Sequence, residues 1–472
     1  MAREIKKAYC KFVGHNAHDV TGSCTLLRFG SKTILLDYGM YQTSDPIADY
    51  KVNKSRHKDI KPKEIDYIFL SHIHADHAAL LPTLYRDGCT APILVPAQSR
   101  PLLQLMLMDS VHVMERDWER YSKRNNISLP PLYDENDVHI TMKYVTECPF
   151  NQEVILPGVM KFMFLPANHI VNAAQIIIEI NDNNVVKKIG YTGDIGSPGA
   201  EKLFMNEFVP IEQVDLLIGE ATYAASTRVH KKKDRVKDIE KIKTVVGECI
   251  KDKGKLLIPV FSLNRLEDVL SVLYDIYGQE ELKIPVVIDT PLGQSIANIW
   301  ADSIDKDQEY WDKVWHWDNL QKPESHKESL AWQNIEGSMI ILSSGGMLTA
   351  GRAVSWAQHL LPDKKNHIMF CGFSSKNSLA TRIKDSTEHH INIDGKNIRN
   401  KAQVSVLNSF SSHADHDELI EYYTAIKYNK IALVHSEADA KNTFADELKK
   451  ALSKADRTSR VISVNQDTKI MI

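Results

Sequence analysis

The six residues His72-Ile73-His74-Ala75-Asp76-His77 constrain this chain more than any other segment. They follow the apolar run 65–70, which has the length and composition of a buried strand. Clustered imidazoles and a carboxylate need partners when buried, so a purely structural or capping role at this strand end is disfavoured. The spacing lets His72 and His74 converge on one ion while Asp76 and His77 face a second. We therefore expect a dinuclear metal site.

Short apolar runs bounded by polar turns alternate with helical patterns, which is typical of an α/β protein. The expected strands are 33–36, 65–70, 161–165, 175–180, 214–218, 256–260, 285–288, 339–342 and 431–434, and the clearest helices are 234–251 and 437–452. A chain of 472 residues is too long for one compact domain. Residues 100–150 favour a helical insertion packed on the first domain, with a substrate-facing lid as the alternative.

Composition excludes several classes of protein. The 6 cysteines form no CxxC pair, so we expect reduced, buried thiols. The amino terminus has no apolar targeting segment, and no window approaches the roughly 20 apolar residues that span a bilayer. We therefore expect a cytoplasmic protein that does not associate with a membrane. A formal net charge of −3 gives no general attraction for polyanions, and any nucleic-acid affinity must come from local basic surface.

The cluster after strand 65–70 resembles motif 2 of the metallo-β-lactamase superfamily, and the other motifs of that fold appear in the required order. Asp37 ends the strand TILLD and matches motif 1, His169 in LPANHIV matches motif 3, and Asp194 in GYTGD matches motif 4. The resemblance implies an α/β fold, the αββα sandwich of this superfamily.

Three later residues resemble the additional motifs of the β-CASP nuclease group. Glu220 in LLIGEATYA matches motif A, His413 in NSFSSHADH matches motif B, and His435 in ALVHSE matches motif C. This group includes the nuclease that cleaves messenger-RNA precursors and bacterial ribonuclease J. The resemblance covers nearly the whole chain.

The resemblance also implies the metal ligands and the chemistry. One zinc would be held by His72, His74, His169 and Asp194, and a second by Asp76, His77, Asp194 and His435, so that Asp194 bridges. Nitrogen ligands suit zinc better than magnesium, with manganese or iron as alternatives. A hydroxide activated between the two ions would attack phosphorus.

The residues expected to carry catalysis are Asp76, His413, Glu220 and Asp37. His413 would donate a proton to the departing oxygen, poised by a hydrogen bond to Glu220. Asp37 would orient a metal ligand by a hydrogen bond without binding the metal itself. For His416 we favour a surface or core role.

Candidate substrate contacts come from segments that resemble the same group. The Gly-rich run 344–352 could form an anion nest with Arg352 beside it, or a tight turn with a structural arginine. The expected contacts are Ser344, Gly345, Arg352, Arg265 and His230. The basic run 228–243 could bind phosphates, although such runs are usually solvated helix faces.

Two segments depart from the family pattern. Asn168 and Asn172 stand where relatives usually carry glycine, so a different backbone course is expected around His169. The segment after Glu220 is two residues longer than usual before Arg228 and His230. Both departures touch the substrate cleft rather than the ligands.

The positions of the motifs predict the domain order. His435 must reach a centre built by residues before 195, so the chain should leave the first domain after about residue 210 and return near 400. We expect residues 1–210 and 401–472 to form the metallo-β-lactamase domain and 211–400 an inserted β-CASP cap, with the active site in the cleft between them. With 36 residues before Asp37 and 37 after His435, a minimal form is expected.

The favoured function is zinc-dependent hydrolysis of single-stranded RNA, because β-CASP enzymes that act on DNA usually lack histidine at motif C. The alternatives are a hydrolase acting on DNA or on a small ester or phosphodiester, and a non-catalytic scaffold. Endonucleolytic and exonucleolytic cleavage both stay open, as does assembly into a homodimer.

Overall fold

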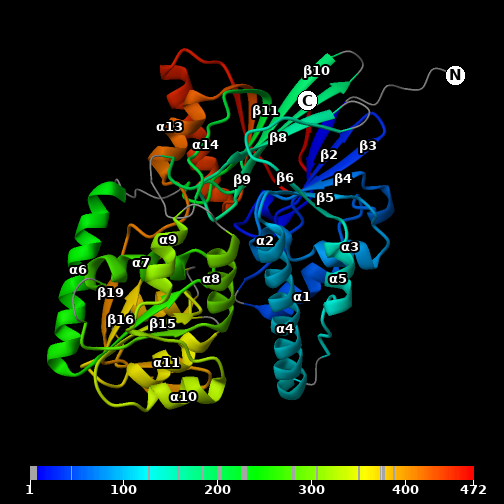
Figure 1. Ribbon diagram of the computed structural model, residues 1–472. Helices are drawn as coiled ribbons and strands as arrows, with labels where there is room; N and C mark the ends of the chain where they lie inside the picture. Colours follow the sequence, from blue (N-terminus) through cyan, green and yellow to red (C-terminus); the bar gives the residue numbers. More distant parts are fainter. Residues whose placement is uncertain are drawn as a thin grey trace. The chain divides into compact units, whose positions relative to one another are not determined.

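The computed structural model describes residues 8–43, 45–125, 128–156, 160–182, 185–198, 205–224, 231–278, 282–303, 307–348, 351–372, 374, 378–385 and 388–472. The chain divides into two compact units. Unit 1 comprises Met1–Arg228 and Ser412–Ile472, and unit 2 comprises Val229–Ser411 (Figure 1). The expected α/β class, with one α/β unit inserted into another, is confirmed.

Unit 1 contains two seven-stranded sheets. The first has the order β22-β1-β2-β3-β4-β5-β6, with β1 (Tyr9–Phe12), β2 (Thr25–Phe29), β3 (Lys32–Leu36), β4 (Tyr67–Phe69), β5 (Ile93–Pro96), β6 (Val145–Cys148) and β22 (Lys469–Met471). The second has the order β21-β20-β11-β10-β9-β8-β7, with β7 (Val154–Leu156), β8 (Met160–Pro166), β9 (Ala174–Asp182), β10 (Val185–Tyr191), β11 (Gln213–Glu220), β20 (Lys427–Val434) and β21 (Arg460–Ser463).

Apolar side chains from both sheets meet in one core. Phe69 of the first sheet packs edge-on against Phe162 of the second, with ring centroids 4.9 Å apart. Along β9, Ile176, Ile178 and Ile180 are buried in this core, because alternate residues of a strand point to the same face. The sheets are thus the two inner layers of the sandwich.

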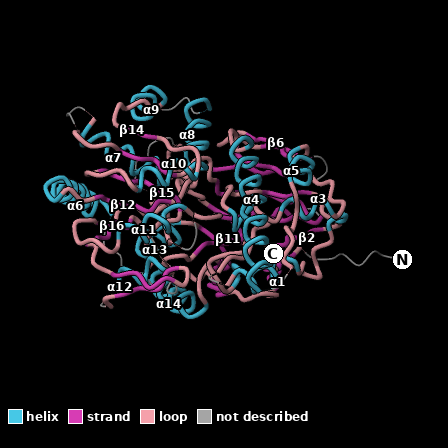
Figure 2. The backbone as a smooth tube through the Cα atoms, turned by 90° about the horizontal axis from the view of Figure 1, so that it is seen from below, coloured by secondary structure: helices cyan, strands magenta, loops and turns pink. Residues whose placement is uncertain are grey.

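The helices of unit 1 pack around these sheets. They are η1 (His15–Ala17), α1 (Pro46–Lys54), η2 (Pro62–Glu64), α2 (Ala75–Ala78), α3 (Leu81–Arg86), α4 (Arg100–Asn125), α5 (Glu135–Met142), α13 (His416–Ala425) and α14 (Ala438–Lys454). Figure 1 and Figure 2 show α13 and α14 side by side. Helix α4 contacts α2, α5 and β6 and buries Leu103, Leu107 and Val111, which favours the packed insertion expected for this stretch.

Unit 2 is built on a parallel six-stranded sheet with the order β14-β13-β15-β12-β16-β19, and a separate β17-β18 hairpin. Its strands are β12 (Lys255–Val260), β13 (Val286–Asp289), β14 (Leu320–Gln321), β15 (Met339–Ser344), β16 (His367–Phe370), β17 (His390–Ile393), β18 (Lys396–Arg399) and β19 (Gln403–Val406). Every residue of β12 is buried, because helices cover both faces of a parallel sheet.

The helices of unit 2 surround this sheet, as Figure 2 shows for the magenta strands. They are α6 (Lys231–Asp252), α7 (Arg265–Tyr277), α8 (Pro291–Ser303), α9 (Gln308–Trp315), α10 (His326–Gln333), α11 (Arg352–Leu360) and α12 (Leu379–Asp385). Each of the nine strands expected from the sequence overlaps an observed strand, and both expected helices overlap α6 and α14.

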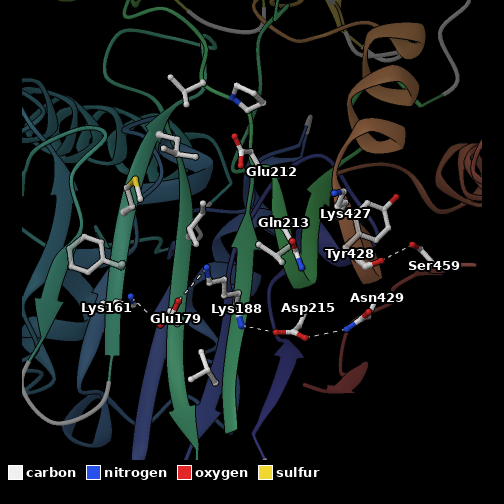
Figure 3. Close-up of a pocket in the computed structure, with 18 of the residues that line it drawn as sticks. Lys161, Glu179, Lys188, Glu212, Gln213, Asp215, Lys427, Tyr428, Asn429 and Ser459 are labelled. Atoms are coloured by element: carbon white, nitrogen blue, oxygen red, sulfur yellow. Dashed lines mark hydrogen bonds and ion pairs between the residues drawn. The ribbon is translucent and has the colours of Figure 1, made fainter. Parts of the chain in front are cut away.

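The outer face of the second sheet in unit 1 carries a ladder of polar side chains, one from each of five adjacent strands (Figure 3). Glu179 lies 3.2 Å from Lys161 and 3.4 Å from Lys188, and Asp215 accepts a hydrogen bond of 3.1 Å from Asn429. The ladder lines a depression of about 930 Å³. None of the predicted metal ligands lines it, so this depression is separate from the predicted site.

Among the described residues, no helix is long and apolar enough to cross a membrane.

A buried carboxyl in unit 2 makes stability depend on pH. Glu267 in α7 is 1% exposed, and burial raises its pKa to about 8 from 4.5. The folded state therefore keeps its proton where the unfolded chain ionises, and stability is lost as pH rises between about 4.5 and 8. We expect Glu267→Gln to gain stability relative to the wild type by at most about 1.4 kcal/mol per pH unit in this window. Thermal unfolding of both proteins at pH 5 and pH 8 measures the stability difference between them. A difference that is the same at both pH values would contradict the prediction.

Candidate metal centre

The predicted ligands follow the ends of strands in unit 1. The His72–His77 segment follows β4 and runs into α2, while Asp194 follows β10 and His435 follows β20. Strands β10, β11 and β20 run parallel to one another, and so do β3 and β4. Parallel neighbours end at the same edge of a sheet, which is why residues far apart in the sequence meet there.

A first group of ligand atoms comes from His72, His74, His169 and Asp194. Nδ1 of His74 lies 3.1 Å from Nε2 of His72 and 3.2 Å from Nε2 of His169. Nitrogens bound at about 2.0–2.1 Å to a tetrahedral zinc are about 3.3 Å apart, so these spacings suit such an ion. Oδ2 of Asp194 completes the group at 3.8 Å from His72 and 3.7 Å from His169.

A second group comes from Asp76, His77 and His435. Oδ2 of Asp76 lies 3.3 Å from Nε2 of His435 and 3.7 Å from Nε2 of His77. The other oxygen of Asp194, Oδ1, lies 3.5 Å from Nε2 of His77. This oxygen is buried and accepts no hydrogen bond from the described residues. A buried carboxylate oxygen without a donor fits a position that faces a cation.

The protonation states in this cluster also suit a metal. Burial lowers the pKa of His72 well below its usual value and that of His74 to about 4, so both rings stay neutral. Burial alone would raise the pKa of Asp194, but His435 and His77 outweigh it and hold the pKa well below the ordinary range. Burial alone would lower the pKa of His77 and His435, but Asp194 outweighs it and raises both, so these two rings hold protons that a metal ion would displace. Neutral imidazole and ionised carboxylate are the forms that bind metal ions.

Asp37 lies behind the second group. It is fully buried, and its Oδ2 lies 2.7 Å from Nδ1 of His77. The hydroxyl groups of Ser71 and Tyr191 donate to the same oxygen at 2.7 Å and 2.6 Å. Because a carboxylate only accepts, Nδ1 of His77 carries the proton and Nε2 is left for an ion. This placement is the one expected for a residue that orients a ligand.

Sequence reasoning missed several of these supporting residues. Ser71 and Tyr191 hold Asp37, and Oγ1 of Thr222 lies 2.8 Å from Nδ1 of His435. Oγ of Ser23 lies 3.2 Å from Nε2 of His77. Ser71, Tyr191 and Thr222 stand inside or beside recognised motifs, so nearness to a motif was the available signal for these three.

Glu220 and His413 lie together beside the ligands. Oε1 of Glu220 lies 3.3 Å from Nδ1 of His413 and accepts the backbone N–H of Ile195 at 2.8 Å. The His413 ring lies 4.5 Å from the ring of His169 and is 20% exposed. His413 is therefore held next to the first group without belonging to either group of ligand atoms described above.

His416 has a different environment. Its Nε2 lies 2.6 Å from Glu447 of α14 and its ring packs edge-on against Phe444. These contacts join α13 to α14 and agree with the core or surface role expected for this histidine.

The asparagines of motif 3 both adopt the left-handed backbone conformation. Asn168 has φ of 56° and Asn172 has φ of 58°. Glycine adopts this conformation most easily and asparagine is among the next best, so these two residues allow the turn that glycine would make. The side chain of Asn168 also donates to the carbonyl of Ser197 at 2.8 Å.

The candidate substrate contacts lie in unit 2 or outside the described residues. Arg352 is bound to Asp289 at 2.6 Å and to the carbonyls of Pro323 and Glu324 at 3.1 Å and 2.7 Å. The amide of Gly345, which follows Ser344 of β15, donates to the carbonyl of Val260 at 3.1 Å. These contacts favour the structural turn over the anion nest.

Arg265 and His230 are the remaining candidate substrate contacts. Arg265 is 6% exposed at the start of α7 and lies 3.9 Å from Asp268. His230 and Arg228 lie outside the described residues.

Comparison with known families matches three parts of the chain. Residues 19–152 match the metallo-beta-lactamase superfamily, 267–383 the Beta-Casp domain, and 397–458 the Zn-dependent metallo-hydrolase RNA specificity domain. The chain therefore belongs to the β-CASP group of the metallo-β-lactamase superfamily.

Individual relatives carry names from RNA metabolism. The chain is 26% identical to Ribonuclease TTHA0252 of Thermus thermophilus, over 90% of this chain and 92% of that protein. It is 25% identical to Transcription termination factor FttA of Methanocaldococcus jannaschii, over 94% and 69%. It is 26% identical to Cleavage and polyadenylation specificity factor 73 of Drosophila melanogaster, over 89% and 58%.

A solved structure shares the fold. A protein of unknown function from Enterococcus faecalis V583 covers 99% of this chain and 100% of its own, with a TM-score of 0.50 and 10% identity. At this identity the likeness concerns the fold alone.

The two ligand groups predict about two transition-metal ions per chain, most readily zinc. Elemental analysis of protein purified without added metal measures the ratio. We expect two equivalents, because each oxygen of Asp194 faces its own group. A ratio of one together with full activity would contradict a dinuclear centre.

Proposed function

We propose that this protein is a ribonuclease that hydrolyses phosphodiester bonds of single-stranded RNA with the help of two zinc ions. The observation that carries the proposal is the shared carboxylate of Asp194, with one oxygen toward each group of ligand atoms. Bound there, two zinc ions would supply the positive charge that acidifies water and neutralises a phosphate oxygen. Manganese or iron are the alternative metals.

The side chains around the centre would orient a ligand, add negative charge and donate a proton. Asp37 keeps His77 in the tautomer whose Nε2 is free for an ion. Asp76 faces the second position and adds negative charge there. His413, held by Glu220, would give its proton to the departing oxygen.

Three family matches support the substrate and the domain roles. The RNA specificity match at 397–458 contains both His413 and His435. The similarity to Ribonuclease TTHA0252 extends over 90% of this chain and 92% of that protein. We assign Met1–Arg228 and Ser412–Ile472 to the metallo-β-lactamase domain and Val229–Ser411 to the β-CASP cap. The boundaries expected at 210 and 400 are replaced, because β11 pairs with β10 and β20 of the first domain. The Beta-Casp match at 267–383 lies inside that cap range.

We further propose that the protein acts in the cytoplasm. All six cysteines are free and buried, which suits a reducing compartment.

Replacing His413 by alanine tests the proton donor. We expect His413→Ala to keep its metal content and to slow RNA cleavage by about 10²–10⁴-fold, because its proposed role is proton transfer rather than ligation. His416→Ala is the matched control, since His416 is paired with Glu447 instead. Cleavage rates and elemental analysis are compared for both variants. Loss of metal from His413→Ala would show that the histidine is a ligand.

The choice of nucleic acid tests the substrate. We expect single-stranded RNA to be cut well and DNA of the same sequence poorly, at one fixed salt concentration. Binding should weaken steeply as salt rises, because a chain of net charge −3 must rely on local Lys and Arg contacts to phosphate. End-labelled and internally labelled strands, with and without chelator, give the rates. Equal rates on both would show that only the phosphate backbone is read, and activity confined to a small ester would overturn the proposal.

A further inference from the structure

Lys441 is a fully buried lysine on α14, the helix that follows the His435 loop. Its side chain is 0% exposed, and burial lowers its pKa to about 8. Among the described residues no carboxylate lies within ion-pair distance of its ammonium group, whose hydrogen bonds go to backbone carbonyls. Burying a cation against neutral dipoles alone adds little net stability, because its lost hydration offsets the contacts.

The two carbonyls that accept from Lys441 belong to segments of unit 1 that are far apart in the sequence. Nζ donates to the carbonyl of Ala17, the last residue of η1, and at 2.7 Å to the carbonyl of Val464, which follows β21. Lysine carries three donors on one tetrahedral nitrogen, so it can join separate carbonyls at one point. Lys441 therefore fixes η1 against the end of the second sheet.

The residue before Ala17 holds the backbone of a predicted metal ligand. The carbonyl of Asn16 accepts the backbone N–H of His435 at 2.6 Å. His435 has φ of 59°, a left-handed conformation that costs a residue with a Cβ on the order of 1 kcal/mol and persists only where its surroundings hold it. The adjacent carbonyls of η1 thus bind the His435 amide and the Lys441 ammonium.

We propose that Lys441 is a positioning residue that acts through η1 to keep His435 at the second metal position. With the backbone of His435 fixed by Asn16 and Nδ1 held by Thr222, Nε2 is directed to within 3.3 Å of Asp76. The amides of His15 and Asn16 also donate to the carbonyl of Gly22, but the Lys441 ammonium is the contact that ties Ala17 to Val464. Without the ammonium, η1 loses this contact and His435 can relax from its left-handed conformation. The inference rests on the proposed metal role of His435.

Zinc titration of metal-free, full-length protein tests this inference. We expect Lys441→Met, which keeps the bulk but removes the donors, to weaken the second zinc by about 10–100-fold and to leave the first unchanged. Activity on single-stranded RNA should return as zinc is raised, with an unchanged KM for RNA. Lys449→Met is the matched control on the same helix, because Lys449 is 53% exposed and pairs only with Asp446 among the described carboxylates.

The possible outcomes separate the inference from the proposed function. Unchanged affinity for both ions, or an equal loss of both, would overturn the positioning role while leaving the ribonuclease proposal standing. A wild-type protein that binds fewer than two zinc ions would overturn both the role and the dinuclear centre. If Lys441→Met does not fold, Lys441→Gln, which keeps one donor group, should show a smaller and equally selective loss of the second zinc. An unselective loss would again overturn the role.

Discussion

The site in unit 1 depends on the electrostatics of one buried carboxylate. Asp194 is 3% exposed, and removing its charge from water is costly unless positive charge surrounds it. His72 and His169 lie near one of its oxygens, and His77 lies near the other. His72 is neutral, so the positive charge comes from His435 and His77, and a bound cation on each side would take over this compensation. The same carboxylate lies between the two groups of predicted ligand atoms.

Strand register brings residues that are far apart in the sequence close to this carboxylate. Strand β20 pairs in parallel with β11, and the register sets Glu220 opposite Val434. The next residue after Val434 is His435, so this pairing places motifs A and C at the same edge of the sheet. A slip of one residue would turn each side chain to the opposite face, which ties the geometry of the site to the burial of the strands.

Backbone conformation is a second constraint at the predicted site. Asp37 and His435 have φ values of 60° and 59°, and Asn168 and Asn172 share this left-handed region. Each conformation costs energy for a residue with a Cβ, and hydrogen bonds from Ser71 to Asp37 and from His435 to Asn16 hold two of them. Other residues with a Cβ, such as Gln98 and Lys253, adopt the same conformation away from the predicted site, so the strain is not confined to it.

The sequence by itself determined the ligand types, their order and the strands that carry them, because the ligand spacing and the apolar periodicity are local properties. The cluster His72 to His77 was predicted from its spacing in this way, whereas His169, Asp194 and His435 were predicted from their resemblance to family motifs in the required order. Only the tertiary structure decided which residues hydrogen-bond to the predicted ligands and which contacts other polar residues, such as Arg352, make. Lys441 has no sequence signal for its role, and Ser71 and Thr222 are marked only by their nearness to motifs. The sequence left Arg352 open between a phosphate contact and a structural arginine, and its bond to Asp289, 63 residues away, favours the structural role. Contacts between residues so distant in the chain follow from sheet order and packing, and single residues do not encode them locally.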